Sequence, residues 1–132
     1  MAISRILIVD DSAVFRRVLR AMLESHPGWY VSEAIDGAEG VKQTRSLAPH
    51  IIIMDLSMRY MSGIEAAREI LREYPMIPIV LLTFVFTNHL AEEVRRCGIR
   101  VALSKTEMHH LIPAVQSLLR GEEFTVPARA GC

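Results

Sequence analysis

The sequence predicts a single doubly wound α/β domain, in which helices cover both faces of a parallel sheet. Short apolar runs of β type alternate along the chain with stretches whose apolar residues recur at helical spacing. Most of these runs are apolar on both faces, which is typical of parallel strands buried on both sides. Right-handed crossovers then favour a doubly wound arrangement. With 132 residues, the chain is long enough for one such domain and too short for two.

The strands are expected at five short runs rich in β-branched and other apolar residues. In chain order they are "RILIVD" at 5–10, "YVSEAI" at 30–35, "HIIIMD" at 50–55, "IPIVLLT" at 77–83 and "IRVALS" at 99–104.

The helices are expected between and after these runs, where apolar residues fall on stripes of helical spacing. The fourth helix, "NHLAEEVRRCG", ends at Gly98, a residue type that favours the left-handed conformation of a helix end. The second, at 38–47, has the least marked pattern. The stripes of the others are Val14, Phe15, Val18, Leu19, Met22 and Leu23; Ala67, Ile70, Leu71 and Tyr74; and Leu111, Ile112, Val115, Leu118 and Leu119.

Composition narrows the class of protein. Fifteen basic and fifteen acidic side chains cancel, so nothing suggests an electrostatic grip on nucleic acid or a membrane. Cys97 and Cys132 have no second Cys or His beside them at ligand spacing, and a reduced, cytoplasmic setting is expected. The acid pair after the first apolar run argues against a secretory signal, and the longest apolar stretch, 76–86, is too short to span a bilayer.

Charged and hydroxyl side chains stand at the ends of four of the predicted strands. In a doubly wound fold, ligands bind beyond the carboxyl ends of the strands, so these residues are expected to meet at one edge of the sheet. Three carboxylates in contact repel one another unless a cation joins them, and Mg²⁺ takes oxygen ligands of this kind. The residues are Asp10, Asp11, Asp55, Thr83, Ser104 and Lys105.

Each of these residues also has a simpler interpretation on its own. Asp11 could cap the helix that begins near Ser12, and Asp55 could be a turn residue. Thr83 could be an ordinary strand threonine, and Lys105 a solvated loop cation. Their joint placement on separate strand ends favours a common site.

Four segments then carry a resemblance to a known family: "ILIVDDS", "DLSMRYMSGIEAAREI", "IPIVLLT" and "LSKTE". In this order and spacing, the chain resembles the receiver domain of a two-component response regulator over about 5–120. The resemblance implies a flavodoxin-like fold, with a five-stranded parallel sheet in the order 2-1-3-4-5 and five helices. It also implies a receiver domain at 4–120, followed at 121–132 by a short tail or a truncated linker.

The resemblance implies a role for each strand-end residue. Asp55 would be the phosphoacceptor, because a carboxylate can serve as a nucleophile and become an aspartyl phosphate. The metal would be Mg²⁺, with Asp11 as a direct ligand, Asp10 acting through water, and Asp55 and the backbone carbonyl of Ser57 completing the set. Thr83 would bond a phosphoryl oxygen, and Lys105 would pair with its charge.

The function implied is a phosphorylation-dependent switch that a sensor histidine kinase or a phosphotransfer protein charges at Asp55. Such a domain catalyses only its own phosphotransfer and dephosphorylation, and is not otherwise an enzyme. A homodimer is expected through the mixed charges of the fourth helix, which are Glu92, Glu93, Arg95 and Arg96. No membrane contact and no direct binding of nucleic acid by this chain are expected, although a DNA-binding output domain could follow residue 132 in a longer protein.

The alternative is a protein interaction module that has the receiver fold but acts independently of phosphorylation. Two departures from the family favour it: Phe84 stands where relatives keep a small residue, and Ala102 replaces an aromatic that moves inward on activation. Arg59 and Thr106 each stand where many receiver domains have proline. The shape of the loop at Arg59 and the presence of a cis peptide bond before Thr106 are therefore in question. An α/β enzyme or nucleotide binder is a weaker third interpretation, because neither glycine-rich phosphate-binding motif follows the first strand.

Overall fold

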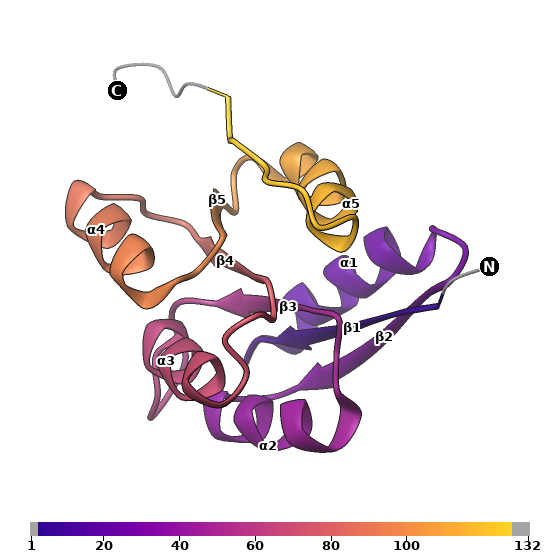
Figure 1. The fold of residues 1–132 in the computed structure, drawn as a ribbon, viewed down its shortest axis with the longest axis horizontal. Helices are drawn as coiled ribbons and strands as arrows, with labels where there is room; N and C mark the ends of the chain where they lie inside the picture. The colour runs from indigo at the N-terminus through magenta and orange to yellow at the C-terminus, as the bar shows by residue number, and fades with distance from the viewer. Residues whose placement is uncertain (1–2, 128–132) are drawn as a thin grey trace.

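The computed structural model describes residues 3–127 and contains one five-stranded parallel sheet in the order β2-β1-β3-β4-β5 (Figure 1). The predicted fold class and strand order are therefore confirmed. The strands are β1 (Ser4–Val9), β2 (Trp29–Ala34), β3 (Ile51–Asp55), β4 (Ile79–Thr83) and β5 (Val101–Ser104). The helices are α1 (Ala13–Glu24), α2 (Gly37–Leu47), α3 (Gly63–Glu73), α4 (Asn88–Cys97) and α5 (Leu111–Leu119), the last preceded by the 3-10 turn η1 (Met108–His110).

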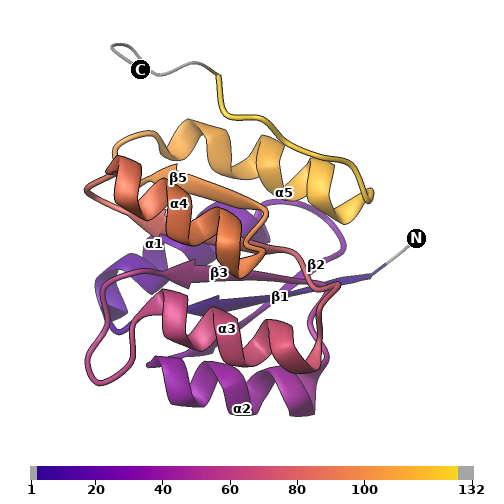
Figure 2. The same cartoon turned by 60° about the vertical axis from the view of Figure 1, so that its left-hand side comes forward.

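Helices cover both faces of the sheet, with α2, α3 and α4 on one face and α1 and α5 on the other (Figures 1 and 2). Alternate residues of each central strand point to opposite faces. In β1, Leu7 and Val9 pack with α2, α3 and α4, whereas Ile6 and Ile8 pack with α1 and α5. Two apolar cores therefore hold β1, β3, β4 and β5 in register, and this fixes where their carboxyl ends lie.

Helix α1 departs from the predicted stripe. Leu19 and Leu23 are buried, but Val14 and Val18 are exposed. Residues spaced four apart lie in one row along a helix, and adjacent rows are turned by about 100°. Of the two apolar rows in α1, the row of Leu19 and Leu23 faces the sheet, whereas in the other row only Met22 packs against this core. The assignment of Val14 and Val18 to the core stripe was wrong.

Helix α2 forms where it was predicted, although its sequence contains two glycines. Asp36 caps it by accepting a hydrogen bond from the Glu39 backbone N–H at 2.8 Å. This cap explains why the helix begins at Gly37.

The segment after α5 packs back onto the domain. Phe124 and Val126 are partly buried against the core formed with α1 and α5. The boundary near residue 120 stays a prediction, and Cys132 lies outside the described residues. Within residues 3–127, every helix is too short or too polar to cross a bilayer.

Candidate functional site

The carboxyl ends of β1, β3, β4 and β5 meet at one open cavity of about 320 Å³. Strand pairing sets Val9 beside Met54, Asp55 beside Leu82 and Thr83 beside Ser104, so all four strands end at a similar level. The cavity is lined by the predicted site residues Asp10, Asp11, Asp55, Ser57, Thr83 and Lys105, together with Ser12, Leu56, Phe84 and Val85.

The three carboxylates form one cluster. Asp10, Asp11 and Asp55 each offer an oxygen, and these oxygens lie within 4.8 Å of one another. Asp10 and Asp55 are buried, while Asp11 is exposed to the solvent. Oxygen ligands alone and a high density of negative charge suit a small hard cation such as Mg²⁺. The residues present therefore fit the metal that receiver domains bind at an acidic pocket.

Lys105 neutralises part of this charge from the opposite wall. Its Nζ lies 2.9 Å from Asp55 Oδ1 and 3.4 Å from Asp10 Oδ2. Only 7% of the Lys105 side chain is exposed, so the interpretation of Lys105 as a solvated loop cation is wrong. The same Nζ lies 4.1 Å from the centre of the Phe15 ring and 5.1 Å from that of Phe84. Both contacts lie within the range of cation–π attraction.

The surroundings of Asp55 disfavour its ionised form relative to water. Burial raises the pKa of Asp55 above its ordinary value of 3.8, the hydrogen bond from Lys105 opposes this, and repulsion from Asp10 and Asp11 adds to it. The ionised form of Asp55 is thus less favourable in the folded metal-free protein than in water, and a bound cation would relieve the repulsion.

Replacing Asp55 by Asn is expected to stabilise the metal-free protein at neutral pH by about 1 kcal/mol. Because the folded pKa is raised, the folded chain binds the proton more tightly, and stability falls as pH rises from 3.8 through the raised pKa. The gain in stability from Asp55→Asn should thus be complete at pH values above the raised pKa of Asp55. It should shrink as the pH falls toward 3.8. Urea unfolding in EDTA at several pH values measures this, with Asp36→Asn as control. An Asp55→Asn protein no more stable than wild type at neutral pH would contradict it.

Backbone groups fix the two adjacent carboxylates at the end of β1. Asp10 Oδ1 accepts a hydrogen bond from the Ser12 N–H at 2.8 Å, and Asp11 Oδ2 accepts one from the Arg59 N–H at 3.1 Å. The cap of α1 is Ser12, whose hydroxyl accepts from the Phe15 N–H at 3.2 Å. The alternative in which Asp11 caps this helix is therefore wrong.

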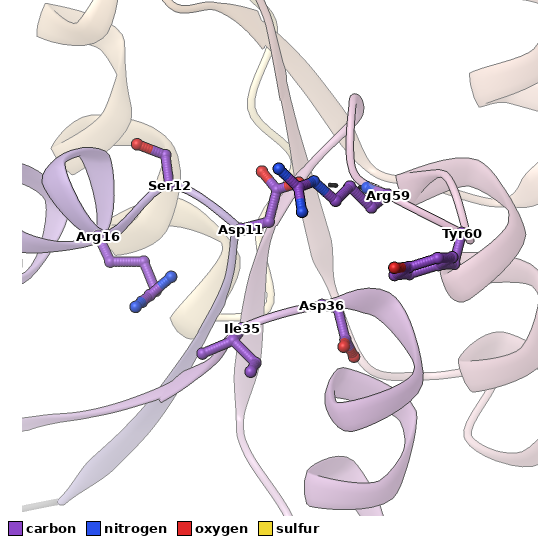
Figure 3. Close-up of a pocket in the computed structure, with 7 residues that line it drawn as sticks. All are labelled: Asp11, Ser12, Arg16, Ile35, Asp36, Arg59 and Tyr60. Atoms are coloured by element: carbon purple, nitrogen blue, oxygen red, sulfur yellow. Dashed lines mark hydrogen bonds between the residues drawn. The ribbon is translucent and has the colours of Figure 1, made fainter.

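Arg59 gives the β3–α3 loop a donor that the common proline lacks, because proline has no backbone N–H. The next residue, Tyr60, is almost fully exposed and has a φ of 70°. A hydrogen bond of 2.7 Å from the Met61 N–H to the Arg59 carbonyl closes this turn. Arg59 and Tyr60 line a second cavity, of about 600 Å³, which meets the first at Asp11 (Figure 3). The loop shape thus follows from Arg59 and Tyr60 together.

The Thr83 hydroxyl bonds to its own loop. It donates to the Val85 carbonyl at 2.9 Å and accepts from the Val85 N–H at 3.2 Å. Thr83 is buried beside Asp55 in the cavity, as the strand-end pattern predicted. Its hydroxyl therefore couples the site to the start of the β4–α4 loop.

The other departures from the family have clear positions. Phe84 is 66% exposed and lines the cavity, so its side chain does not turn into the core. Ala102 is buried in the core beside α2, α3 and α4. Thr106 follows Lys105 without a cis peptide, since every peptide bond described between residues 3 and 127 is trans. Its hydroxyl lies 2.6 Å from that of Ser104.

Gly63 packs closely against the end of β3, at Asp55 and Leu56. A Cβ at Gly63 would lie 2.2 Å from the Asp55 carbonyl oxygen and 3.0 Å from the Leu56 Cα. The Gly63 N–H also donates to the Leu56 carbonyl at 2.8 Å. Only glycine lets α3 begin this close to the end of β3.

Gly63→Ala is expected to lower the free energy of unfolding by about 1–3 kcal/mol, the usual cost of forcing extra atoms against packed structure. The matched control is Gly37→Ala, because Gly37 also begins a helix but its added Cβ would meet the flexible Met61 side chain, at 3.0 Å. Urea unfolding of both variants measures the difference, and equal losses would contradict the proposed close contact.

Sequence reasoning missed two residues of this site. Phe15 was assigned only to a core stripe, and Arg16 was not considered. Phe15 contacts Lys105, and Arg16 Nη1 donates to the Asp10 carbonyl at 2.7 Å. Their place one helical turn after the acid pair is the signal that could have found them.

Comparisons with known proteins agree on one family. A family model described as "Response regulator receiver domain" matches residues 6–116. A protein-glutamate methylesterase/protein-glutamine glutaminase of Alkalilimnicola ehrlichii is 46% identical over 80 residues, which are 60% of this chain and 20% of that protein. The transcriptional regulatory protein LiaR of Bacillus subtilis is 37% identical over 120 residues, which are 89% of this chain and 57% of LiaR.

A solved structure shares the whole architecture. The crystal structure of a LuxR-family two-component response regulator from Aurantimonas sp. SI85-9A1 matches with a TM-score of 0.89 and 29% identity, over 96% of this chain and 91% of that one. The chain spans less than two thirds of either curated relative, and of the methylesterase only a fifth.

Proposed function

The chain belongs to the family of response regulator receiver domains of two-component systems. We propose that it is a signalling switch controlled by phosphorylation of Asp55. The observation that carries this proposal is the buried contact of Asp55 with Lys105, at 2.9 Å, inside a cluster of three carboxylates. A carboxylate that faces both a fixed cation and a fitting metal site has what phosphoryl transfer needs from a protein, which is position and neutralising charge.

The metal proposed is Mg²⁺, held by Asp10, Asp11, Asp55 and the backbone carbonyl of Ser57. When bound, it supplies positive charge to the oxygens of the transferring group and cancels the repulsion among the carboxylates. All four residues line the same cavity, with Ser57 two residues beyond Asp55 on the β3–α3 loop. Asp10 acts through water in this proposal.

Asp55 is the nucleophile of the proposed reaction. One of its carboxylate oxygens bonds to phosphorus as the bond between phosphorus and the donor atom breaks, and the donor leaves with that electron pair. Lys105 pairs with the phosphoryl oxygens in place of its present carboxylate partners. Water later attacks the phosphorus, the bond between phosphorus and the Asp55 oxygen breaks, and inorganic phosphate leaves with Asp55 restored as a free carboxylate.

In this proposal, Thr83 links phosphorylation of Asp55 to a conformational change. The phosphoryl group brings about −1.5 to −2 charges and three acceptor oxygens beside the Thr83 hydroxyl. The hydroxyl can donate to one of these oxygens only by giving up its donation to the Val85 carbonyl, which lies 2.9 Å away. The β4–α4 loop would then move with its bonded partner, and this is the proposed output of the switch.

The proposed partners are a sensor histidine kinase or a phosphotransfer protein as donor, and a second copy of the chain. On α4, Glu92 pairs with Arg95 at 2.8 Å and with Arg96 at 3.9 Å within one protomer. A dimer through this face would exchange such pairs between copies. For a longer protein that contains this chain, we propose a DNA-binding output domain beyond residue 132. Within this chain, the proposed reaction is confined to Asp55.

The alternative function, an interaction module that works without phosphorylation, rests on Phe84. Its ring lies beside Lys105 and narrows the approach to the cavity. Titration with beryllofluoride and Mg²⁺, followed by NMR, separates the two functions, because beryllofluoride mimics the phosphoryl group only on a competent carboxylate. The switch predicts shifts at Thr83, Val85 and Lys105 in wild type and none in Asp55→Asn, whereas an unresponsive wild type would support the module.

A further inference from the structure

Arg16 reaches back from α1 over the end of β1, where the acid pair begins (Figure 3). Its Nη1 donates to the Asp10 carbonyl oxygen at 2.7 Å, and its Nε donates to Glu33 Oε1 at 2.8 Å. Only 14% of the Arg16 side chain is exposed. The guanidinium is thus fixed at two points, and one of them is the peptide that joins the two adjacent carboxylates.

Glu33 is the anchor of this arrangement. It lies on β2 beside Ile8 of β1, and its second oxygen accepts a hydrogen bond from Arg20 Nε at 2.6 Å. The hydrogen bond from Arg20 holds the pKa of Glu33 below its ordinary value, with burial opposing and Arg16 adding to the effect. Arg20 also pairs with Glu24 at 2.9 Å. The two cations and two carboxylates balance, so Arg16 acts near the acid cluster through its geometry and brings little net charge.

The peptide between Asp10 and Asp11 decides where both carboxylates point. A peptide unit is planar, so a hydrogen bond to its carbonyl oxygen restrains the orientation of the plane that carries both Cα atoms. The other groups of Asp10 already have partners, since its N–H donates to the Ala34 carbonyl at 3.2 Å and its side chain accepts from the Ser12 N–H. The hydrogen bond from Arg16 gives the Asp10 carbonyl oxygen a partner as well.

We propose that Arg16, held by Glu33, is a positioning residue that sets the Asp10–Asp11 peptide so that Asp11 can bind Mg²⁺ directly and Asp10 can hold it through water. This inference rests on the proposed function. Groups that orient metal ligands from outside typically change metal affinity by 10- to 100-fold when they are replaced. Arg16→Met, which keeps most of the aliphatic stem and removes both hydrogen bonds, should weaken Mg²⁺ binding by about tenfold or more.

The matched control is Arg20→Met. It removes a hydrogen bond to the same Glu33 and the pair with Glu24, but Arg20 does not touch the Asp10 carbonyl. Isothermal titration calorimetry of wild type, Arg16→Met, Arg16→Lys and Arg20→Met gives the dissociation constants for Mg²⁺. The backbone NMR shifts of Asp10 and Asp11 in the metal-free proteins give a second reading that does not depend on phosphorylation.

The expected result is weaker Mg²⁺ binding and shifted Asp10 and Asp11 signals in Arg16→Met, a smaller effect in Arg16→Lys, and wild-type affinity in Arg20→Met. If Arg16→Met does not fold, Arg16→Lys carries the same comparison. Equal affinities in all four proteins, or equal losses in Arg16→Met and Arg20→Met, would overturn the positioning role and leave the proposed function standing. A wild type without affinity for Mg²⁺ would overturn both.

Discussion

Mg²⁺ at one hundred times its dissociation constant should raise the free energy of unfolding of this protein by about 2.7 kcal/mol, because a ligand that binds only the folded state stabilises it. The expected source is the cluster of Asp10, Asp11 and Asp55, whose oxygens lie within 4.8 Å of one another. Without a cation, these carboxylates repel, and Lys105 is the cation that the structure places against Asp55 and Asp10. Thermal unfolding at increasing Mg²⁺ concentration measures the effect.

Asp11→Asn should lose most of this gain. Asp11 is the exposed member of the cluster, so its replacement removes a ligand with little disturbance of the core. The control is Asp36→Asn, because Asp36 lies across the second cavity from the cluster and caps α2, a task that Asn also performs. Equal responses to Mg²⁺ in wild type and Asp11→Asn would remove Asp11 from the metal site.

Phe84→Ala should speed both phosphorylation and dephosphorylation, by about tenfold if the ring adds roughly 1.4 kcal/mol to each barrier. The ring lines the cavity of Asp55, and its centre lies 5.1 Å from Lys105 Nζ, so it narrows the approach of a donor and of water. Since the ring is 66% exposed, its loss should cost little stability, far below the usual cost of about 3–5 kcal/mol for a buried Phe. Rates with a small phosphodonor, followed by mass spectrometry, test this.

Phe84→Leu separates the two effects of the ring. Leu keeps much of the bulk but has no π face for Lys105. Slow rates in Phe84→Leu and fast rates in Phe84→Ala would assign the effect to bulk, while fast rates in both would assign it to the contact with Lys105. Wild-type rates in both variants would exclude a gate at Phe84.

The fold could be predicted because its strongest signals are local. Each central strand is apolar on both faces and each helix has an apolar stripe, and these patterns leave few topologies open. The error at Val14 and Val18 has a physical reason, since α1 carries two apolar rows and the sequence alone does not say which one meets the sheet. The strand order came from the family resemblance and was confirmed.

The site was predictable as a set of strand ends and less so in its contacts. Parallel strands bring Asp55, Thr83 and Lys105 to one edge by topology alone, so their convergence follows from the pattern. The spacing of Arg16 from the acid pair places it near the site, but its contact with the Asp10 carbonyl depends on its side-chain conformation, which no spacing rule encodes. The contact of the Arg59 N–H with Asp11 likewise depends on the conformation of a loop. The bond of Thr83 to Val85 is of the same kind.

Intact-mass spectrometry after incubation with acetyl phosphate tests the proposed switch most directly. The expected result is a gain of one phosphoryl group in wild type with Mg²⁺, no gain in EDTA, and no gain in Asp55→Asn under either condition. Labelling of Asp55→Asn as readily as wild type, or a wild type that no small donor or kinase can label, would contradict the assignment of Asp55 as the phosphoacceptor.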